Sequence, residues 1–171
     1  MIASRQLCAT LATMSSKRTV ALATTISVLL LGTTALGDPA TAYRRYKGKI
    51  VCSETQIPND LGIESLKTLA KSEITRPSDS EPWSFYFVGF LTRKPEESPI
   101  FLVFYSVDKS KQDSYAALQE INVDPSSTIV MANVSLSKED GLSPGGKYNV
   151  FLARRVGGKE IVYAKTQLTF R

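Results

Sequence analysis

The chain has 171 residues, with 21 Lys and Arg, 16 Asp and Glu and no histidine, which gives a formal net charge of +5. This length favours one domain with at most a tail. The absence of histidine excludes imidazole general bases, His-containing triads and His metal ligands. From residue 50 onward 14 basic residues stand against 15 acidic ones, so the body has no net basic charge to attract nucleic acid.

An uncharged run at 19–37 follows Lys17 and Arg18 directly. A positive end, an apolar middle and small residues beyond it are typical of a secretory signal. Met14 opens a compact basic segment before the run, and translation from Met14 is a further hypothesis. Two alternatives are a retained transmembrane anchor, because the run is long enough to span a bilayer, and a transit peptide, because residues 1–37 contain no acid.

The expected leader is residues 1–42, followed by a single domain at 43–171. The A-x-A pattern that ends at Ala42 predicts cleavage between Ala42 and Tyr43, and the bond between Gly37 and Asp38 is the second choice. The protein is therefore predicted to be periplasmic or secreted, with single-pass membrane anchoring as the alternative. The exported part contains only Cys52 and so forms no internal disulfide; we interpret Cys52 as a small buried hydrophobic residue.

The first predicted elements lead into a core. Segment 42–54 starts with basic residues and becomes a strand, and 61–73 has the apolar spacing of a short amphipathic helix. Segment 76–82 is a polar loop. Strands are predicted at 83–93 and 100–107, and both carry apolar residues on both faces, as strands in the middle of a packed architecture do.

Four more strands are predicted at 115–123, 128–137, 149–156 and 159–171, the last two joined by a Gly-Gly hairpin turn. In the last strand Val162 is expected to share a face with Ala164, Leu168 and Phe170. The total is about seven strands with frequent turns and one short helix. This pattern predicts a mostly-β protein, a two-sheet antiparallel sandwich.

The spacing of Leu142, Pro144 and Tyr148 resembles the tyrosine corner of fibronectin type III and related immunoglobulin-like domains, over residues 128–171. The resemblance implies an Ig-like sandwich in which the Tyr148 hydroxyl bonds to upstream backbone and Trp83 is a core residue of an early strand. The whole chain also resembles small exported proteins of Gram-negative bacteria with no assigned role, which implies only an exported location.

No nucleophile, phosphate-binding or dinucleotide motif is present in the chain. We therefore predict a non-enzymatic protein without a cofactor or metal, and interpret its short acidic pairs as turns rather than calcium sites. A carboxylate-dependent hydrolase is the alternative, because two carboxylates distant in sequence can meet in space.

The predicted function is an exported binding or structural module that acts on a protein or an envelope surface, without nucleic acid. Loops held by rigid strands are common contact sites. Loop 76–82 is the leading candidate, with Arg76, Asp79 and Glu81 as the proposed partner contacts, and the tip at 108–114 is the second candidate.

A basic cluster, Arg44, Arg45, Lys47 and Lys49, follows the uncharged run closely. If the leader is retained, this cluster is placed to contact anionic lipid headgroups, and the membrane is a partner in that case alone. If the leader is removed, the cluster is a solvated basic arm beside an early strand.

Overall fold

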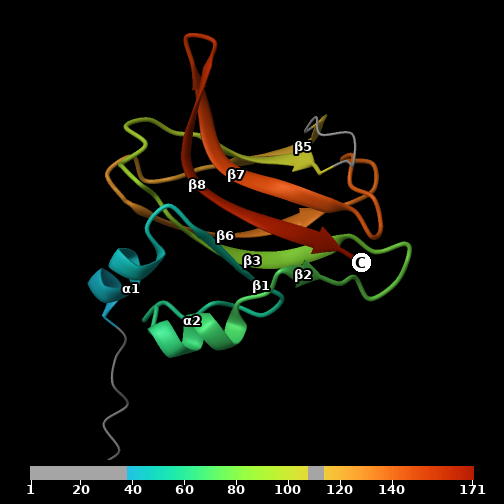
Figure 1. Cartoon of the computed structure of the whole chain (residues 1–171), viewed down its shortest axis with the longest axis horizontal. Helices are drawn as coiled ribbons and strands as arrows, with labels where there is room; N and C mark the ends of the chain where they lie inside the picture. Colours follow the sequence, from blue (N-terminus) through green and yellow to red (C-terminus); the bar gives the residue numbers. More distant parts are fainter. Residues whose placement is uncertain (1–37, 108–113) are drawn as a thin grey trace, which may run out of the picture. The chain divides into compact units, whose positions relative to one another are not determined.

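The computed structural model describes residues 38–107 and 114–171 (Figure 1). The predictions for residues 1–37, including Gly37, and for 108–113 of the second candidate loop lie outside the described residues. In chain order the elements are α1 (Pro39–Tyr46), β1 (Ile50–Ser53), α2 (Ile63–Leu69), β2 (Glu73–Ile74), β3 (Trp83–Phe90), β4 (Ile100–Ser106), β5 (Ser114–Ile121), β6 (Ile129–Leu136), β7 (Lys147–Val156) and β8 (Lys159–Phe170).

The strands form two sheets, a three-stranded one in the order β1-β3-β6 and a five-stranded one in the order β2-β8-β7-β4-β5. The prediction of a mostly-β protein with two sheets is therefore confirmed. The sheets are not wholly antiparallel, however, because β2 pairs parallel with the end of β8, Glu73 with Thr169 and Ile74 with Phe170. A strand of two residues has no alternation of its own, and so no periodicity marked it in the sequence.

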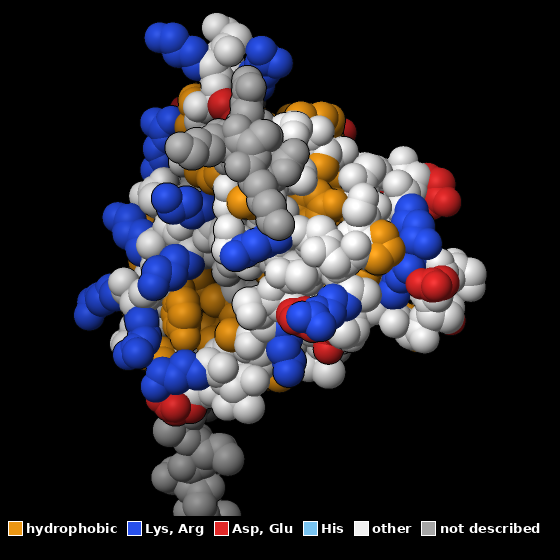
Figure 2. All heavy atoms as spheres, turned by 45° about the vertical axis from the view of Figure 1, so that its right-hand side comes forward, with side chains coloured by type: hydrophobic (Ala, Val, Ile, Leu, Met, Phe, Trp, Pro, Cys, Tyr) orange, Lys and Arg blue, Asp and Glu red, His pale blue; other side chains and the backbone are white. Residues whose placement is uncertain are grey.

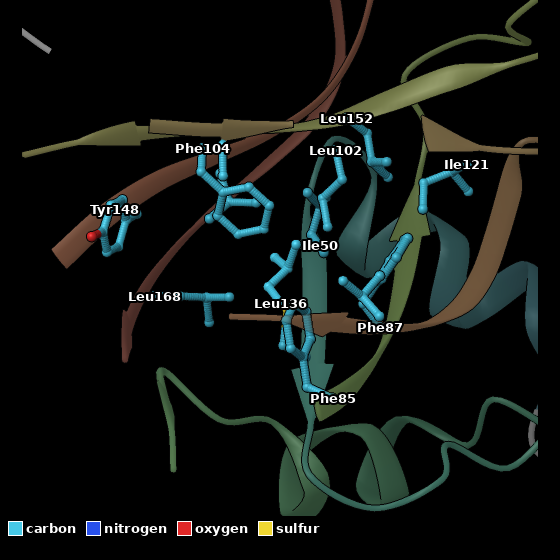
Figure 3. Close-up of a cluster of buried hydrophobic side chains, with 14 of the residues drawn as sticks. Ile50, Phe85, Phe87, Leu102, Phe104, Ile121, Leu136, Tyr148, Leu152 and Leu168 are labelled. Atoms are coloured by element: carbon cyan, nitrogen blue, oxygen red, sulfur yellow. The ribbon is translucent and has the colours of Figure 1, made fainter. Parts of the chain in front are cut away.

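The main core lies between the two sheets, where side chains from both inner faces meet (Figure 3). Within this core the Phe170 ring contacts four other aromatic rings, among them Trp83 with ring centroids 5.5 Å apart and Tyr148 with centroids 5.7 Å apart, both edge to face. Pairs of this geometry contribute about 0.5–1.5 kcal/mol beyond the area they bury. Trp83 is fully buried, and its indole nitrogen donates to the Arg171 carbonyl oxygen at 2.7 Å.

A second core lies on the outer face of the three-stranded sheet, which both helices cover. Ala42 of α1 and Leu66 of α2 are fully buried there with Val88 and Phe90 of β3. This explains why β3 is apolar on both faces, since Phe85 and Phe87 point into the main core. In β4 the inner residues also enter the main core, while on the outer face Val103 is buried and Phe101 and Tyr105 are only partly covered.

Helix α1 was not predicted, and the expectation of one helix was wrong. The Asp38 carboxylate accepts a hydrogen bond from the Ala40 amide at 3.0 Å, and Pro39 occupies the first turn, so the helix has a standard N-terminal cap. The Tyr43 hydroxyl donates to the Leu91 carbonyl at 2.9 Å, and the Tyr46 ring stacks on Phe90. The segment expected to lead into a strand is therefore helical, and residues assigned to the leader form the first half of a packed helix.

The prediction that Val162 shares the buried face of β8 was also wrong. Ala164, Leu168 and Phe170 are buried, but Val162 is 41% exposed. Leu152 pairs with Ala164 but Ala153 pairs with Val162, so Tyr163 is an extra residue in β8, and this bulge reverses the face of the β8 residues that precede it.

The segment that resembles a tyrosine corner closes the sandwich beside the end of β8. The Ser143 amide donates to the buried Tyr148 hydroxyl at 2.8 Å, and Leu142 is buried beside it, while Pro144 is exposed. Gly146 is required here, because a Cβ atom at this position would lie 2.6 Å from the Tyr148 hydroxyl. The hydroxyl is thus bonded to upstream backbone, as the resemblance implies.

Candidate functional site

Figure 1 shows the loop that joins β2 to β3, and a hollow of about 400 Å³ lies beside this loop. The ends of β1 and β2 and the start of β3 contribute its walls together with the loop. Its lining residues are Glu54, Thr75, Arg76, Pro77, Glu81, Pro82 and Ser84. The leading candidate loop from the sequence therefore borders a concave surface, as many ligand sites do.

Arg76 lines the hollow, but its charge is held within the fold. The guanidinium carbon lies 4.6 Å from the centre of the Trp83 ring, and the same group is ion-paired with the Asp79 carboxylate. It also donates to the Asp79 carbonyl oxygen at 2.7 Å. The Arg76 side chain is only 5% exposed whereas that of Asp79 is 94% exposed, so Arg76 braces the loop and offers a partner little surface.

Glu54 also lines the hollow and is hydrogen-bonded to Thr75 at the end of β2. One carboxylate oxygen accepts both the Thr75 amide at 2.7 Å and the Thr75 hydroxyl at 2.5 Å. The hydrogen bond from the hydroxyl, then that from the amide, lower the pKa of Glu54, because both stabilise its charged form. Glu54 is therefore an anion at neutral pH.

Glu81 closes the loop on itself. Its carboxylate accepts from the Ser78 hydroxyl at 3.2 Å, and its amide donates to the Ser78 carbonyl at 3.3 Å. The hollow is thus lined by two carboxylates, Glu54 and Glu81, and by one cation, Arg76, whose charge Asp79 already neutralises. The lining itself therefore carries net negative charge, with one exposed cation outside it, Lys71, near Glu54.

The structure places the three predicted contact residues in different roles. Arg76 and Glu81 line the hollow, while Asp79 lies outside the lining and fixes Arg76. Sequence reasoning missed Glu54 and Thr75, which are 21 residues apart and meet only because of the way β1 and β2 end. No local pattern could have indicated that contact.

A second, smaller hollow of about 140 Å³ lies on the outer face of the five-stranded sheet. Phe101, Val103 and Tyr105 of β4 line it with Tyr115 and Leu118 of β5, and the last two are 61% and 45% exposed. The Tyr105 hydroxyl donates to Glu160 at 2.8 Å, and this hydrogen bond to a carboxylate raises the pKa of Tyr105.

Cys52 is buried in the main core, which confirms its interpretation as a hydrophobic core residue. Burial raises the pKa of its thiol to about 12, so it is not a reactive thiolate at neutral pH. Among residues 38–107 and 114–171, no three His, Cys, Asp or Glu side chains are grouped as metal ligands would be. Within the same ranges no helix has the length and hydropathy needed to cross a bilayer.

Comparison of the chain with protein-family models, with curated proteins and with solved structures finds no match in any of the three. Function is therefore inferred from the residues described above.

Proposed function

We propose that the protein is an exported, non-enzymatic binding module with an immunoglobulin-like sandwich, and that the hollow beside residues 75–82 binds a protein partner. The observation that carries this proposal is the charge of the hollow. Glu54 and Glu81 line it, and its only lining cation, Arg76, is already paired with Asp79. The complementary ligand is an exposed Lys or Arg side chain on another protein.

Two features support the immunoglobulin-like assignment. Strands β1, β3 and β6 form one sheet while β4, β5, β7 and β8 lie in the other, so that the chain crosses between the sheets in the Greek-key manner of such sandwiches. The Tyr148 hydroxyl is also bonded to backbone five residues upstream. Neither feature identifies a partner, because one sandwich supports many functions.

For the leader we propose cleavage between Gly37 and Asp38, the second of the two positions expected from the sequence. Cleavage after Ala42 would remove the Asp38 cap and the fully buried Ala42 from α1. Cleavage before Asp38 leaves the helix whole and delivers a periplasmic or secreted domain. Retention of the leader as a membrane anchor is the alternative outcome.

The alternative of a carboxylate-dependent hydrolase is less well supported by the hollow. Such enzymes need one carboxyl group that keeps its proton near neutral pH, and this requires a raised pKa. The pKa of Glu54 is lowered instead. Turnover of a substrate by the purified protein, lost on Glu54→Gln or Glu81→Gln, would overturn the non-enzymatic proposal.

The proposal is tested by affinity capture from envelope extract with the tagged exported protein. The site variant combines Glu54→Gln with Glu81→Gln, which removes the two carboxylates of the lining and leaves the Arg76–Asp79 pair in place. The control variant combines Asp60→Asn with Glu120→Gln, which removes the same charges at two exposed positions outside the lining.

The proposal predicts a protein captured by the wild type and by the control variant, but at least about tenfold more weakly by the site variant, since electrostatic contacts of this kind each contribute up to several-fold in affinity. All three proteins should melt at similar temperatures. Equal capture by all three would place the binding surface elsewhere, and the outer face of the five-stranded sheet would be the next surface to alter.

A further inference from the structure

Three segments that are distant in sequence meet around Gly48. The Lys165 amide of β8 donates to the Gly48 carbonyl at 3.0 Å, and Lys49 forms an isolated bridge with Lys165. A Cβ atom at Gly48 would lie 3.2 Å from the Thr92 methyl group, so the segment after β3 also packs against this point. The end of α1, the middle of β8 and the segment after β3 therefore share one region of the surface.

Each of these segments carries exposed cations and no acid. Residues 39–53, 82–95 and 161–171 contain neither Asp nor Glu. Their cations in this region are all exposed and define what we call the basic patch: Arg44, Arg45, Lys47, Lys49, Arg93, Lys94 and Lys165. Figure 2 shows many Lys and Arg side chains along the left side of the molecule, with few acidic side chains among them.

The ion pairs of the described residues do not neutralise this patch. They are formed by four other cations, Lys67, Arg76, Arg154 and Arg171. Glu96 and Glu97 follow Lys94, and Glu97 is paired with Arg154. Two acids outside the three segments, Asp38 and Asp124, lie near the patch. The pKa of Asp38 is lowered by its hydrogen bond with Thr41 and, to a smaller extent, by Arg44, and that of Asp124 by its hydrogen bonds with Ser126 and, to a smaller extent, by Lys94. The patch is therefore a local field of positive charge in a body whose formal charges nearly cancel.

We propose that the basic patch binds anionic lipid headgroups and holds the α1 side of the sandwich against a membrane surface. A membrane is a laterally extended anionic surface, and it matches cations that are spread over three segments. The inference rests on the proposed export, which delivers the domain to a compartment bounded by a membrane, and it extends the lipid contact expected for a retained leader to a domain that begins at Asp38.

The side chains around the patch favour a lipid surface over an acidic protein. Protein interfaces usually bury aromatic or apolar anchors as well as charges. The aromatic side chains of α1 are used inside the fold, since Tyr43 bonds to Leu91 and Tyr46 stacks on Phe90. The outward face of α1 instead presents Arg44 and Arg45. The patch is thus suited to a peripheral association that depends on charge alone and weakens with salt.

The test is flotation of the protein, as purified from producing cells, with two kinds of vesicle: phosphatidylcholine alone, and two parts phosphatidylcholine with one part phosphatidylglycerol. The patch variant combines Arg45→Gln, Lys49→Gln and Lys165→Gln. The control variant combines Lys138→Gln, Lys147→Gln and Lys159→Gln, which removes the same charge from exposed positions outside the patch. A third variant, Arg45→Lys with Lys49→Arg and Lys165→Arg, keeps every charge.

The wild type, the control variant and the charge-keeping variant should bind the anionic vesicles and release them as salt is raised. The patch variant should bind at least about tenfold more weakly, because each removed cation near an anionic surface costs several-fold in affinity. Equal losses in the patch and control variants, equal binding to neutral vesicles, or binding to neither vesicle would overturn the proposal. Salt-sensitive capture of an acidic protein in place of vesicles would overturn it too. This test is independent of the proposed partner site, because it changes none of the residues that line the hollow.

Discussion

The hollow and the basic patch are both rich in charge, but they use charge in opposite ways. Arg76 in the hollow lies against the Trp83 ring and is paired with Asp79, so that its side chain is only 5% exposed. Arg45 in the patch is exposed on the outward face of α1. An arginine of the first kind belongs to the fold, and one of the second kind is available to a partner.

The difference teaches that neither net charge nor a charged segment identifies a binding surface. Loop 76–82 is conspicuous in the sequence, yet its cation is neutralised within the loop. Lys165 is unremarkable in the sequence, yet it joins Lys49 at the centre of the patch. The predictions that follow measure how much individual polar contacts within the fold contribute to its stability.

The largest effect on stability is expected for Tyr148→Phe, which removes a hydroxyl group that is hydrogen-bonded within the fold. The Ser143 amide would lose its partner in a part-buried corner, which should lower the free energy of unfolding by about 1–3 kcal/mol. The matched control is Tyr115→Phe, because the Tyr115 side chain is 61% exposed and the change should have little effect. Denaturant melts of both variants measure this, and an unchanged midpoint and slope for Tyr148→Phe would remove the tyrosine-corner assignment.

A smaller effect is expected for Arg76→Ala, which separates the two kinds of arginine directly. Loss of the contact with Trp83 should cost about 1–2 kcal/mol of stability, since a largely desolvated cation over an indole contributes that much. Arg45→Ala should change stability by less than about 0.5 kcal/mol, as surface changes usually do. Thermal unfolding of the two variants side by side gives the answer, and equal losses would contradict the contrast drawn between hollow and patch.

The smallest effect is expected for the contribution of Glu54 to the pH dependence of the free energy of unfolding. Its pKa in the folded protein lies below the ordinary value of 4.5, so its stabilising contribution is present above that pH and is lost as the pH falls through the lowered pKa. Because the carboxylate is largely solvent-screened, the contribution is less than about 0.5 kcal/mol. The free energies of unfolding of wild type and Glu54→Gln should therefore differ slightly at pH 6 and become equal at acid pH. A difference that grows as the pH falls would contradict the hydrogen bonding between Glu54 and Thr75.

Local pattern was sufficient for the parts of the fold that depend on near neighbours in sequence. Alternation identified β6, apolar residues on both faces placed β3 in the middle of the packing, and a short spacing predicted the hydrogen bond between Tyr148 and upstream backbone. Local pattern failed where the same residues fitted two interpretations, and where pairing between strands distant in sequence determines the structure. Asp38 and Pro39 cap a helix, but they stand where a leader was expected to end.

The remaining errors have the same physical origin. The bulge at Tyr163 reverses the face of the β8 residues before it, and no pattern in the sequence of β8 marks it. Glu54 meets Thr75, and Lys49 meets Lys165, through strand pairing that spans many residues. Both surfaces on which function is proposed are therefore products of topology, which explains why the sequence indicated only one wall of the hollow and four of the cations in the patch.

The intact mass of the exported protein tests most directly the claim that α1 belongs to the folded body and presents the basic patch on it. A chain that begins at Asp38 is predicted, because this residue caps α1 and Ala42 is fully buried beneath it. A chain that begins at Tyr43 would contradict the claim, since the cap and the buried alanine would both be missing from the functional protein.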